Sequence, residues 1–140
     1  MRMLEGEKIS ERSKDWFEQA KKDLEVSKIL FDTENCEWVS FAAQQAFEKA
    51  LEAVLEKFGR KAWGYSAYEL LKVVESFLNI DVDEEVSEGT KFLDKYYIIS
   101  KYPNGWISGT PHDFITKKEA EDAILYSGKI IRFCESILHR

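Results

Sequence analysis

One segment of the chain carries residue types that can bind or cleave a phosphodiester. Within residues 101–115, Lys101 can neutralise a phosphate and Tyr102 can stack on a base. Asn104 can hydrogen-bond a base edge or a ribose. His112 can act as a general acid or base, because an imidazole titrates near neutral pH. Three of these residues also have simpler interpretations. Lys101 can be a solvated cation at a helix end, Tyr102 a loop anchor, and His112 a surface or capping residue.

A second polar feature lies inside a strongly apolar helical stretch. Between Trp38 and Gly59 the apolar residues recur at helical spacing, and Gln44 stands one turn before Glu48 at the edge of that stripe. A polar pair in this position needs hydrogen-bonding partners, either inside the fold or from a partner. We therefore keep Gln44 and Glu48 as ligand-binding candidates, beside their interpretation as a satisfied buried pair or part of a dimer interface.

Several kinds of catalytic site are missing from the sequence. It contains no Gly-rich phosphate loop, no His-x-x-x-His pair and no Gly-x-Ser-x-Gly elbow. The only histidines are His112 and His139, which rules out a histidine-rich metal site, and we expect neither a metal nor a cofactor. Cys36 and Cys134 are too few for a disulfide scaffold, so we expect buried, reduced thiols.

Composition and charge limit the class of protein. The chain has 140 residues, of which 44% are hydrophobic and 33% are charged, as in a globular domain with solvated helix faces. Its formal net charge of −6 excludes a uniformly basic nucleic-acid surface but leaves room for a local basic patch. No apolar run approaches the roughly 20 residues of a membrane span, and residues 1–8 lack the apolar core of a signal peptide. We therefore expect a cytoplasmic protein without a membrane partner.

Apolar spacing and capping signals predict a single domain over residues 1–140 with about five helices. We expect a flexible polar lead-in at residues 1–9 and a first helix that begins at Ser10 or Ser13 and ends near Asp32. Further helices are expected at residues 38–58, 66–78, 84–100 and from the capping box at Thr116 to the C-terminus. Residues 96–99 also fit a strand, but their continuity with the preceding helix favours helix.

The long segment between the last two helices has a different character. Prolines and an Asn-Gly turn signal stop helices within residues 101–115, and the aromatic side chains there predict a long ordered loop. The expected fold class is therefore an all-α, antiparallel helix bundle organised around the helix at residues 38–58.

Four motifs, in chain order, resemble those of the HEPN domain family. Residues 43–51, with Gln44, Glu48 and Lys49, resemble the family signature on its second helix. The first helix is similar at residues 16–24, and Gly64-Tyr65 resembles the Gly-His pair at the start of the third helix. Residues 93–103 resemble the fourth helix and its Arg-Tyr-Pro end. The likeness covers nearly the whole chain and implies a small α-helical bundle.

The resemblance implies a role in nucleotide or RNA biology. Many HEPN proteins are metal-independent ribonucleases whose motif is an Arg, four to six residues, and then a His, paired with its twin in a homodimer. Others bind nucleotides or RNA without catalysis, and many small ones are encoded beside a nucleotidyltransferase in toxin–antitoxin pairs. In this chain Lys101 replaces the Arg, and ten residues separate it from His112. Lysine supplies positive charge without the bidentate fork of arginine.

Three functional hypotheses follow for this chain. The first is a homodimer that binds a nucleotide or RNA phosphate near Lys101 and Tyr102 and works with a nucleotidyltransferase-like partner in a toxin–antitoxin-type pair. The second is a metal-independent endoribonuclease with a degenerate site, in which His112 is the acid/base and Lys101 stabilises the pentacoordinate phosphate. The third is a non-catalytic adaptor that binds only protein.

Overall fold

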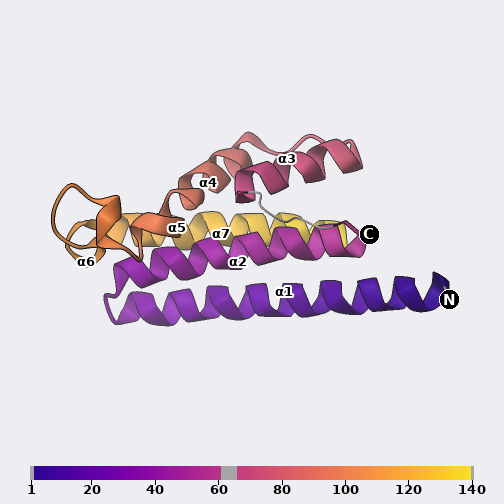
Figure 1. The fold of residues 1–140 in the computed structure, drawn as a ribbon, viewed down its shortest axis with the longest axis horizontal. Helices are drawn as coiled ribbons and strands as arrows, with labels where there is room; N and C mark the ends of the chain where they lie inside the picture. Colours follow the sequence, from indigo (N-terminus) through magenta and orange to yellow (C-terminus); the bar gives the residue numbers. More distant parts are fainter. Residues whose placement is uncertain (1, 61–65, 140) are drawn as a thin grey trace.

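The structure, a computed structural model, describes residues 2–60 and 66–139 (Figure 1). Within these ranges every regular element is helical, which confirms the predicted all-α class. The elements are α1 (Arg2–Asp32), α2 (Cys36–Lys57), α3 (Ala67–Leu78), α4 (Glu84–Asp94), α5 (Tyr96–Ile99), the 3₁₀ turn η1 (Pro103–Gly105), α6 (Pro111–Phe114) and α7 (Lys117–Leu138). Residues 61–65, which include the predicted Gly64-Tyr65 motif, lie outside the described residues.

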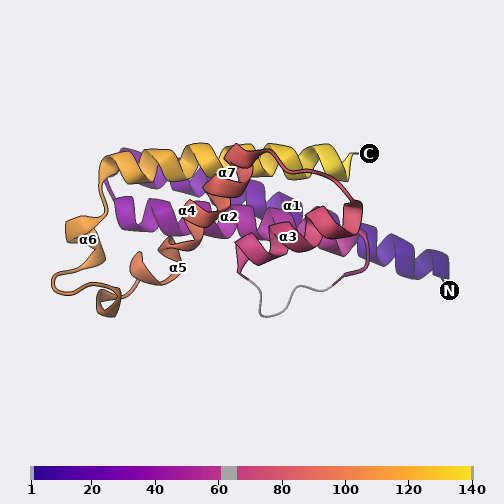
Figure 2. The same ribbon diagram turned by 90° about the horizontal axis from the view of Figure 1, so that it is seen from above.

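The long helices α1, α2 and α7 lie side by side along the longest axis of the molecule (Figures 1 and 2). The helix α1 runs antiparallel to α2, whereas α7 runs in the same direction as α2. The shorter α3 and α4 cover a further face, and α5, η1 and α6 gather at the end where α2 and α7 begin. The start of α1 and the end of α7 lie at the other end of the bundle.

The helix α2 is the centre of the bundle, as its apolar pattern predicts. It contacts α1 and α7 along its length, and also α3, α4, α5 and α6. Its buried face combines fully buried alanines with larger apolar side chains: Ala43, Ala46, Phe47, Ala50, Leu51, Ala53, Val54 and Leu55. The small alanines let the neighbouring helices approach closely, and the larger residues fill the remaining space at interior packing density.

Hydrogen bonds join the neighbouring helices to α2 through its backbone. The hydroxyl of Ser13 on α1 donates to the carbonyl of Ala53 at 2.7 Å, and that of Ser127 on α7 donates to the carbonyl of Ala43 at 2.8 Å. These contacts need small residues on both sides, because the hydroxyl must reach a carbonyl that already belongs to a helix. A partly buried ion pair between Asp23 and Lys49, at 2.5 Å, adds a charged link between α1 and α2.

The start of α1 corrects the prediction from sequence. Helical geometry begins at Arg2, where a lead-in at residues 1–9 and a cap at Ser10 or Ser13 were expected. The physical reason is that residues 2–12 contain no proline and are mostly good helix formers, so nothing interrupts the helix. Ser13 is a buried hydroxyl inside the helix and donates to α2 instead of capping α1.

The predicted fourth helix is shorter than expected, because α4 ends at Asp94 and residues 96–99 form the separate helical turn α5. At the end of α4, the Asp94 carboxylate accepts hydrogen bonds from the backbone N–H groups of Ala67 and Tyr68 at the start of α3. In α5, the buried Tyr96 donates its hydroxyl to Glu119 of α7.

Residues 101–115 contain two helical turns rather than one continuous irregular loop. Pro103 begins η1 and Pro111 begins α6, each at a position where a missing N–H costs nothing. The indole N–H of Trp106 donates to the carbonyl of Ile99 at 2.8 Å, and the Trp106 ring stacks on Phe114. These two contacts join the segment to α5 and α6 and hold its two turns together.

Two glycines allow a direct test of the packing between α4 and α7. A Cβ on Gly89 would lie 2.5 Å from the ring of Tyr126, which itself packs on Phe92. We expect Gly89→Ala to lower the free energy of unfolding by about 1–3 kcal/mol in urea denaturation, because overpacking outweighs the gain in helix propensity.

The matched control is Gly128→Ala on α7, where the added Cβ meets only the flexible end of Arg132 at 3.4 Å. This variant should be as stable as the parent or more stable, by up to about 1 kcal/mol. Equal destabilisation by both substitutions would contradict the close packing of Tyr126 on α4.

Candidate functional site

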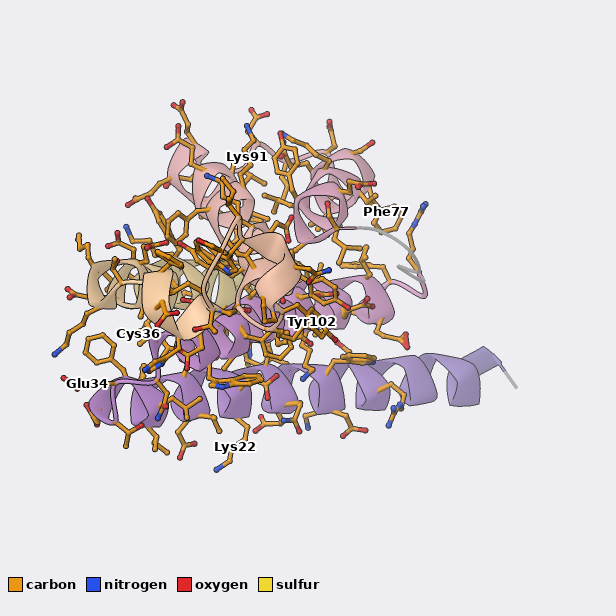
Figure 3. The ribbon with its side chains drawn as sticks, turned by 60° about the vertical axis from the view of Figure 1, so that its left-hand side comes forward. Lys22, Glu34, Cys36, Phe77, Lys91 and Tyr102 are labelled. Atoms are coloured by element: carbon orange, nitrogen blue, oxygen red, sulfur yellow. The ribbon has the colours of Figure 1, made fainter. Side chains whose placement is uncertain are left out.

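The residues singled out by the sequence in 101–115 lie at the end of the bundle where α2 begins. Figure 3 brings this end forward and labels Tyr102 there. Three short elements, α5, η1 and α6, lie at the end of the bundle where α2 begins. The site is therefore assembled from one long buried helix and a segment that reaches it from far along the chain.

Lys101 occupies a cluster of aromatic rings. Its ammonium lies 4.6 Å from the ring centre of Phe41, 4.4 Å from that of Tyr97 and 5.2 Å from that of Tyr102. Such cation–π contacts orient the ammonium without neutralising its charge. Among residues 12–60, 66–97 and 99–139, no carboxylate forms an ion pair with Lys101. The cluster therefore presents an uncompensated positive charge among aromatic faces.

Two of the rings around Lys101 remain open to solvent. Tyr102 is 50% exposed and Tyr97 is 46% exposed, and both belong to the segment that follows α4. Trp38, one turn before Phe41 on α2, packs edge-on against it and is also exposed. Exposed aromatic faces around a cation are suited to stacking a nucleobase. Asn104, on η1, is exposed and follows this cluster closely in the sequence.

His112 is held by a residue that the sequence analysis did not single out. Its Nδ1 lies 2.9 Å from Oε2 of Glu37, in the first turn of α2. The Glu37 side chain is nearly buried, whereas the His112 ring is exposed. The contact occupies one ring nitrogen and leaves Nε2 facing away from Glu37. A buried carboxylate that orients an exposed imidazole is the arrangement used by general acid–base groups.

Lys101 and His112 contact adjacent turns of α2. Their partners on α2, Phe41 and Glu37, are four residues apart, and residues at that spacing share a helix face. Sequence reasoning missed Glu37 and Phe41 because their contacts with His112 and Lys101 join parts of the chain more than 50 residues apart. It also missed Tyr97, which lies only four residues before Lys101. Only the spacing of Glu37 and Phe41 on one face of α2 was visible in the sequence.

Gln44 and Glu48 follow Phe41 along α2 and hydrogen-bond to each other. Gln44 is only 2% exposed, and its amide donates to Oε2 of Glu48 at 3.0 Å. Gln45 donates to the Gln44 carbonyl oxygen at 2.7 Å. The geometry agrees with the satisfied polar pair that the sequence left open. It leaves Gln44 little surface for a ligand, whereas Glu48 is partly exposed.

Glu48 belongs to a group of three carboxylates whose pKa values are raised in the folded protein. Burial raises the pKa of Glu48, and the hydrogen bond from Gln44 opposes that rise. Burial also raises the pKa of Asp94, against the hydrogen bonds from the N–H groups of Tyr68 and Ala67. Burial and the charges of Glu48 and Glu56 raise the pKa of Glu52 to about 7. The carboxylates thus favour protonation in the folded state.

No metal centre accompanies these carboxylates in the part of the chain that the structure describes, where no group of three or more His, Cys, Asp or Glu residues could hold an ion. Cys36 and Cys134 are both free, and Cys134 is fully buried.

Across residues 2–60 and 66–139, no helix has the length and apolar character needed to cross a membrane.

The raised pKa of Glu52 predicts how stability depends on pH. Between the ordinary value of 4.5 and about 7, the folded protein keeps a proton that the unfolded chain has released. Stability from this group is therefore present at acidic pH and is lost as the pH rises through about 7. Glu52→Gln should reduce this slope and raise the free energy of unfolding at pH 8 by about 1 kcal/mol after solvent screening.

Urea denaturation at pH 5 and pH 8 measures the difference, and the exposed Glu121→Gln on α7 is the matched control. A Glu52→Gln protein that is less stable than the parent at pH 8 would show that the ionised carboxylate has a stabilising partner.

Comparisons with known proteins agree with this architecture. The sequence profile described as "HEPN domain" matches residues 13–137. The chain is similar to the solved structure of TT1696 from Thermus thermophilus, with 37% identity, a TM-score of 0.85, and coverage of 90% of this chain and 98% of that one. A HEPN domain protein from Thermotoga maritima is 36% identical, with a TM-score of 0.73 and coverage of 90% and 98%.

The archaeal HEPN homologue ST0689 is 27% identical, with a TM-score of 0.76 and coverage of 90% of this chain and 97% of that one. No functionally curated protein matches the chain. The profile match spans most of the chain, and the structural relatives align over nearly their full lengths. The chain therefore belongs to the HEPN domain family.

Proposed function

We propose that this protein binds the phosphate group of a nucleotide or RNA at the cluster formed by Lys101, Tyr102 and Asn104. The observation that carries the proposal is the position of the Lys101 ammonium over three aromatic rings, two of which are about half exposed. The rings orient the cation, and no described carboxylate competes with a phosphate for it. A bound base can stack on Tyr102 while its phosphate contacts Lys101.

The proposal includes partners and a location. Following the resemblance of its motifs, we place the protein as a homodimer that works with a nucleotidyltransferase-like partner in a toxin–antitoxin-type pair. Exposed apolar side chains near the site, including Trp38, Phe114 and the fully exposed Ile107, support a role in protein contacts. The two free cysteines suit the reducing cytoplasm.

A second candidate function rests on the contact between His112 and Glu37. With Nδ1 held by the buried carboxylate, Nε2 can take the proton of a ribose 2′-hydroxyl as that oxygen attacks phosphorus. The P–O5′ bond then breaks to leave a 2′,3′-cyclic phosphate, and the leaving 5′-oxygen takes a proton from water. Lys101 stabilises the pentacoordinate phosphate on the way. This is a metal-independent endoribonuclease with Lys101 in place of arginine. An adaptor that binds only protein is the remaining alternative.

Replacing Lys101 tests the binding role. Lys101→Ala should weaken binding of labelled single-stranded RNA by about tenfold or more at low salt, because a charge-assisted contact to phosphate is lost. It should also make the slope of log affinity against log salt shallower by about 0.7, the value for one phosphate contact. Fluorescence anisotropy at several salt concentrations measures both quantities.

Lys95→Ala is the matched control, since Lys95 is an exposed lysine nearby that contacts none of the three rings. Tyr102→Ala should lower the affinity but leave the salt slope unchanged, because stacking releases no counterions. If Lys101→Ala and Lys95→Ala have the same small effect, the binding role of this cluster fails.

Replacing His112 tests the nuclease. His112→Ala should abolish any metal-independent cleavage seen with EDTA present, while RNA binding stays within about twofold, because the ring acts on the proton rather than the phosphate charge. Glu37→Gln should slow cleavage and shift its pH profile, since the amide can orient the ring but not stabilise an imidazolium. Gel analysis of labelled RNA with purified protein measures the rates. Cleavage that survives in His112→Ala would assign the chemistry to another group.

A further inference from the structure

A groove on the opposite part of the bundle from Lys101 lies outside the site described above. It has a volume of about 520 Å³ and is lined by Arg60, Lys72, Val73, Ser76 and Phe77. In Figure 3, Phe77 lies well away from Tyr102, and Figures 1 and 2 show α3 and the α5–α6 segment at different places along the bundle axis. A groove of this size falls within the range of small-molecule sites.

The end of α2 fixes the position of Arg60. Gly59 adopts the left-handed conformation, with φ of 71°, and the N–H of Arg60 donates to the carbonyl of Leu55 at 2.9 Å. These are the features of a Schellman cap, which closes α2. The cap directs the Arg60 side chain onto Phe77 of α3, with the guanidinium carbon 4.0 Å from the ring centre.

The stacked guanidinium keeps its hydrogen-bonding edges available. Cation–π contact uses the face of the group, whereas its N–H donors point outward in the plane. Within the described ranges, no carboxylate forms an ion pair with Arg60. Phe77 also packs edge-on against Phe58, so the ring that supports Arg60 is itself held in place.

The other polar groups of the groove come from one face of α3. Lys72 and Ser76 are four residues apart and both line it. Lys72 contacts Glu75 at 3.2 Å, with the lysine half exposed and the carboxylate largely buried, so Glu75 partly offsets the charge of Lys72. Among the described residues, two cations and a hydroxyl line the groove in a chain whose net charge is −6.

We propose that this groove binds the phosphate group of a small molecule. Arg60 supplies the bidentate fork, Lys72 a point charge and Ser76 a hydroxyl donor. Val73 and Phe77 provide an apolar wall for whatever organic group carries the phosphate. The groove is a second anion site, separate from the Lys101 cluster.

The test is isothermal titration calorimetry of the intact protein with pyrophosphate and with ADP, at low and at physiological salt. Arg60→Gln and Lys72→Gln should each weaken binding by about tenfold, the loss expected for one charge-assisted contact. Arg60→Lys keeps the charge without the fork and should also weaken binding, though by less than Arg60→Gln. The Arg60 and Lys72 side chains are both exposed, and circular dichroism verifies that the variants fold.

Lys91→Gln is the matched control within the same region. Its ammonium lies 4.9 Å from the ring centre of Tyr68, as that of Lys72 lies 5.2 Å from it, but Lys91 does not line the groove. Lys101→Ala separates this site from the one proposed above. Lys91→Gln should bind pyrophosphate and ADP as the parent does, whereas Lys101→Ala should lose only the binding at the Lys101 cluster and keep the binding that Arg60→Gln removes.

Each result decides the inference. Equal binding of pyrophosphate and ADP, lost in Arg60→Gln, supports a site that recognises phosphate alone. Binding of ADP only, lost in Arg60→Gln and Lys72→Gln, supports it with a contribution from the nucleoside. No binding of either compound at millimolar concentration overturns it, as does an equal loss in Lys91→Gln. Loss in Lys101→Ala alone overturns this site and assigns the anion to the Lys101 cluster.

Discussion

The burial of α2 on three sides is the constraint on which most of this molecule depends. A helix covered by α1, α7 and the α3–α4 layer has little room for large side chains at its contacts, and its alanines at 43, 46, 50 and 53 are fully buried. Close approach also makes the backbone of α2 reachable, so Ser13 and Ser127 can donate to its carbonyls. The burial of α2 thus limits the size of its side chains and also brings hydroxyl donors to its backbone carbonyls.

The same constraint has an electrostatic consequence. Polar residues on the remaining edge of α2 are partly removed from water, so they need hydrogen bonds or protons. Gln44 donates to Glu48, and Asp94 accepts from the first N–H groups of α3, where a negative charge also suits the helix dipole. Burial nonetheless raises the pKa values of Glu48, Glu52 and Asp94 together. All three carboxylates therefore bind a proton more readily in the folded protein than in the unfolded chain.

Each end of α2 lies beside a cation that rests on aromatic rings, but different local structures place the two cations. At its start, segments too short to form a core of their own are held by side-chain contacts such as Trp106 on Phe114. They leave Lys101 among aromatic rings and His112 on Glu37. At its end, the Schellman cap places Arg60 on Phe77. In both places a cation rests on aromatic faces and keeps its charge uncompensated within the described residues, which suits anionic ligands.

The sequence alone determined the helical class, the central helix, the capping box at Thr116 and the family resemblance. The first three depend on local spacing: apolar residues at helical period, and Thr116 three residues before Glu119. It also predicted the segment around Lys101 as the place for a phosphate site.

Only the tertiary structure decided which residues surround that proposed site. Glu37 and Phe41 contact His112 and Lys101 because the segment after α5 folds back onto the first turns of α2. It also showed that Gln44 is satisfied inside the fold, that Ser13 bonds to α2 instead of capping α1, and that Arg60 and Lys72 share a groove. Helix spacing is encoded by neighbours along the chain, whereas these contacts join residues that only the packing of whole helices brings together.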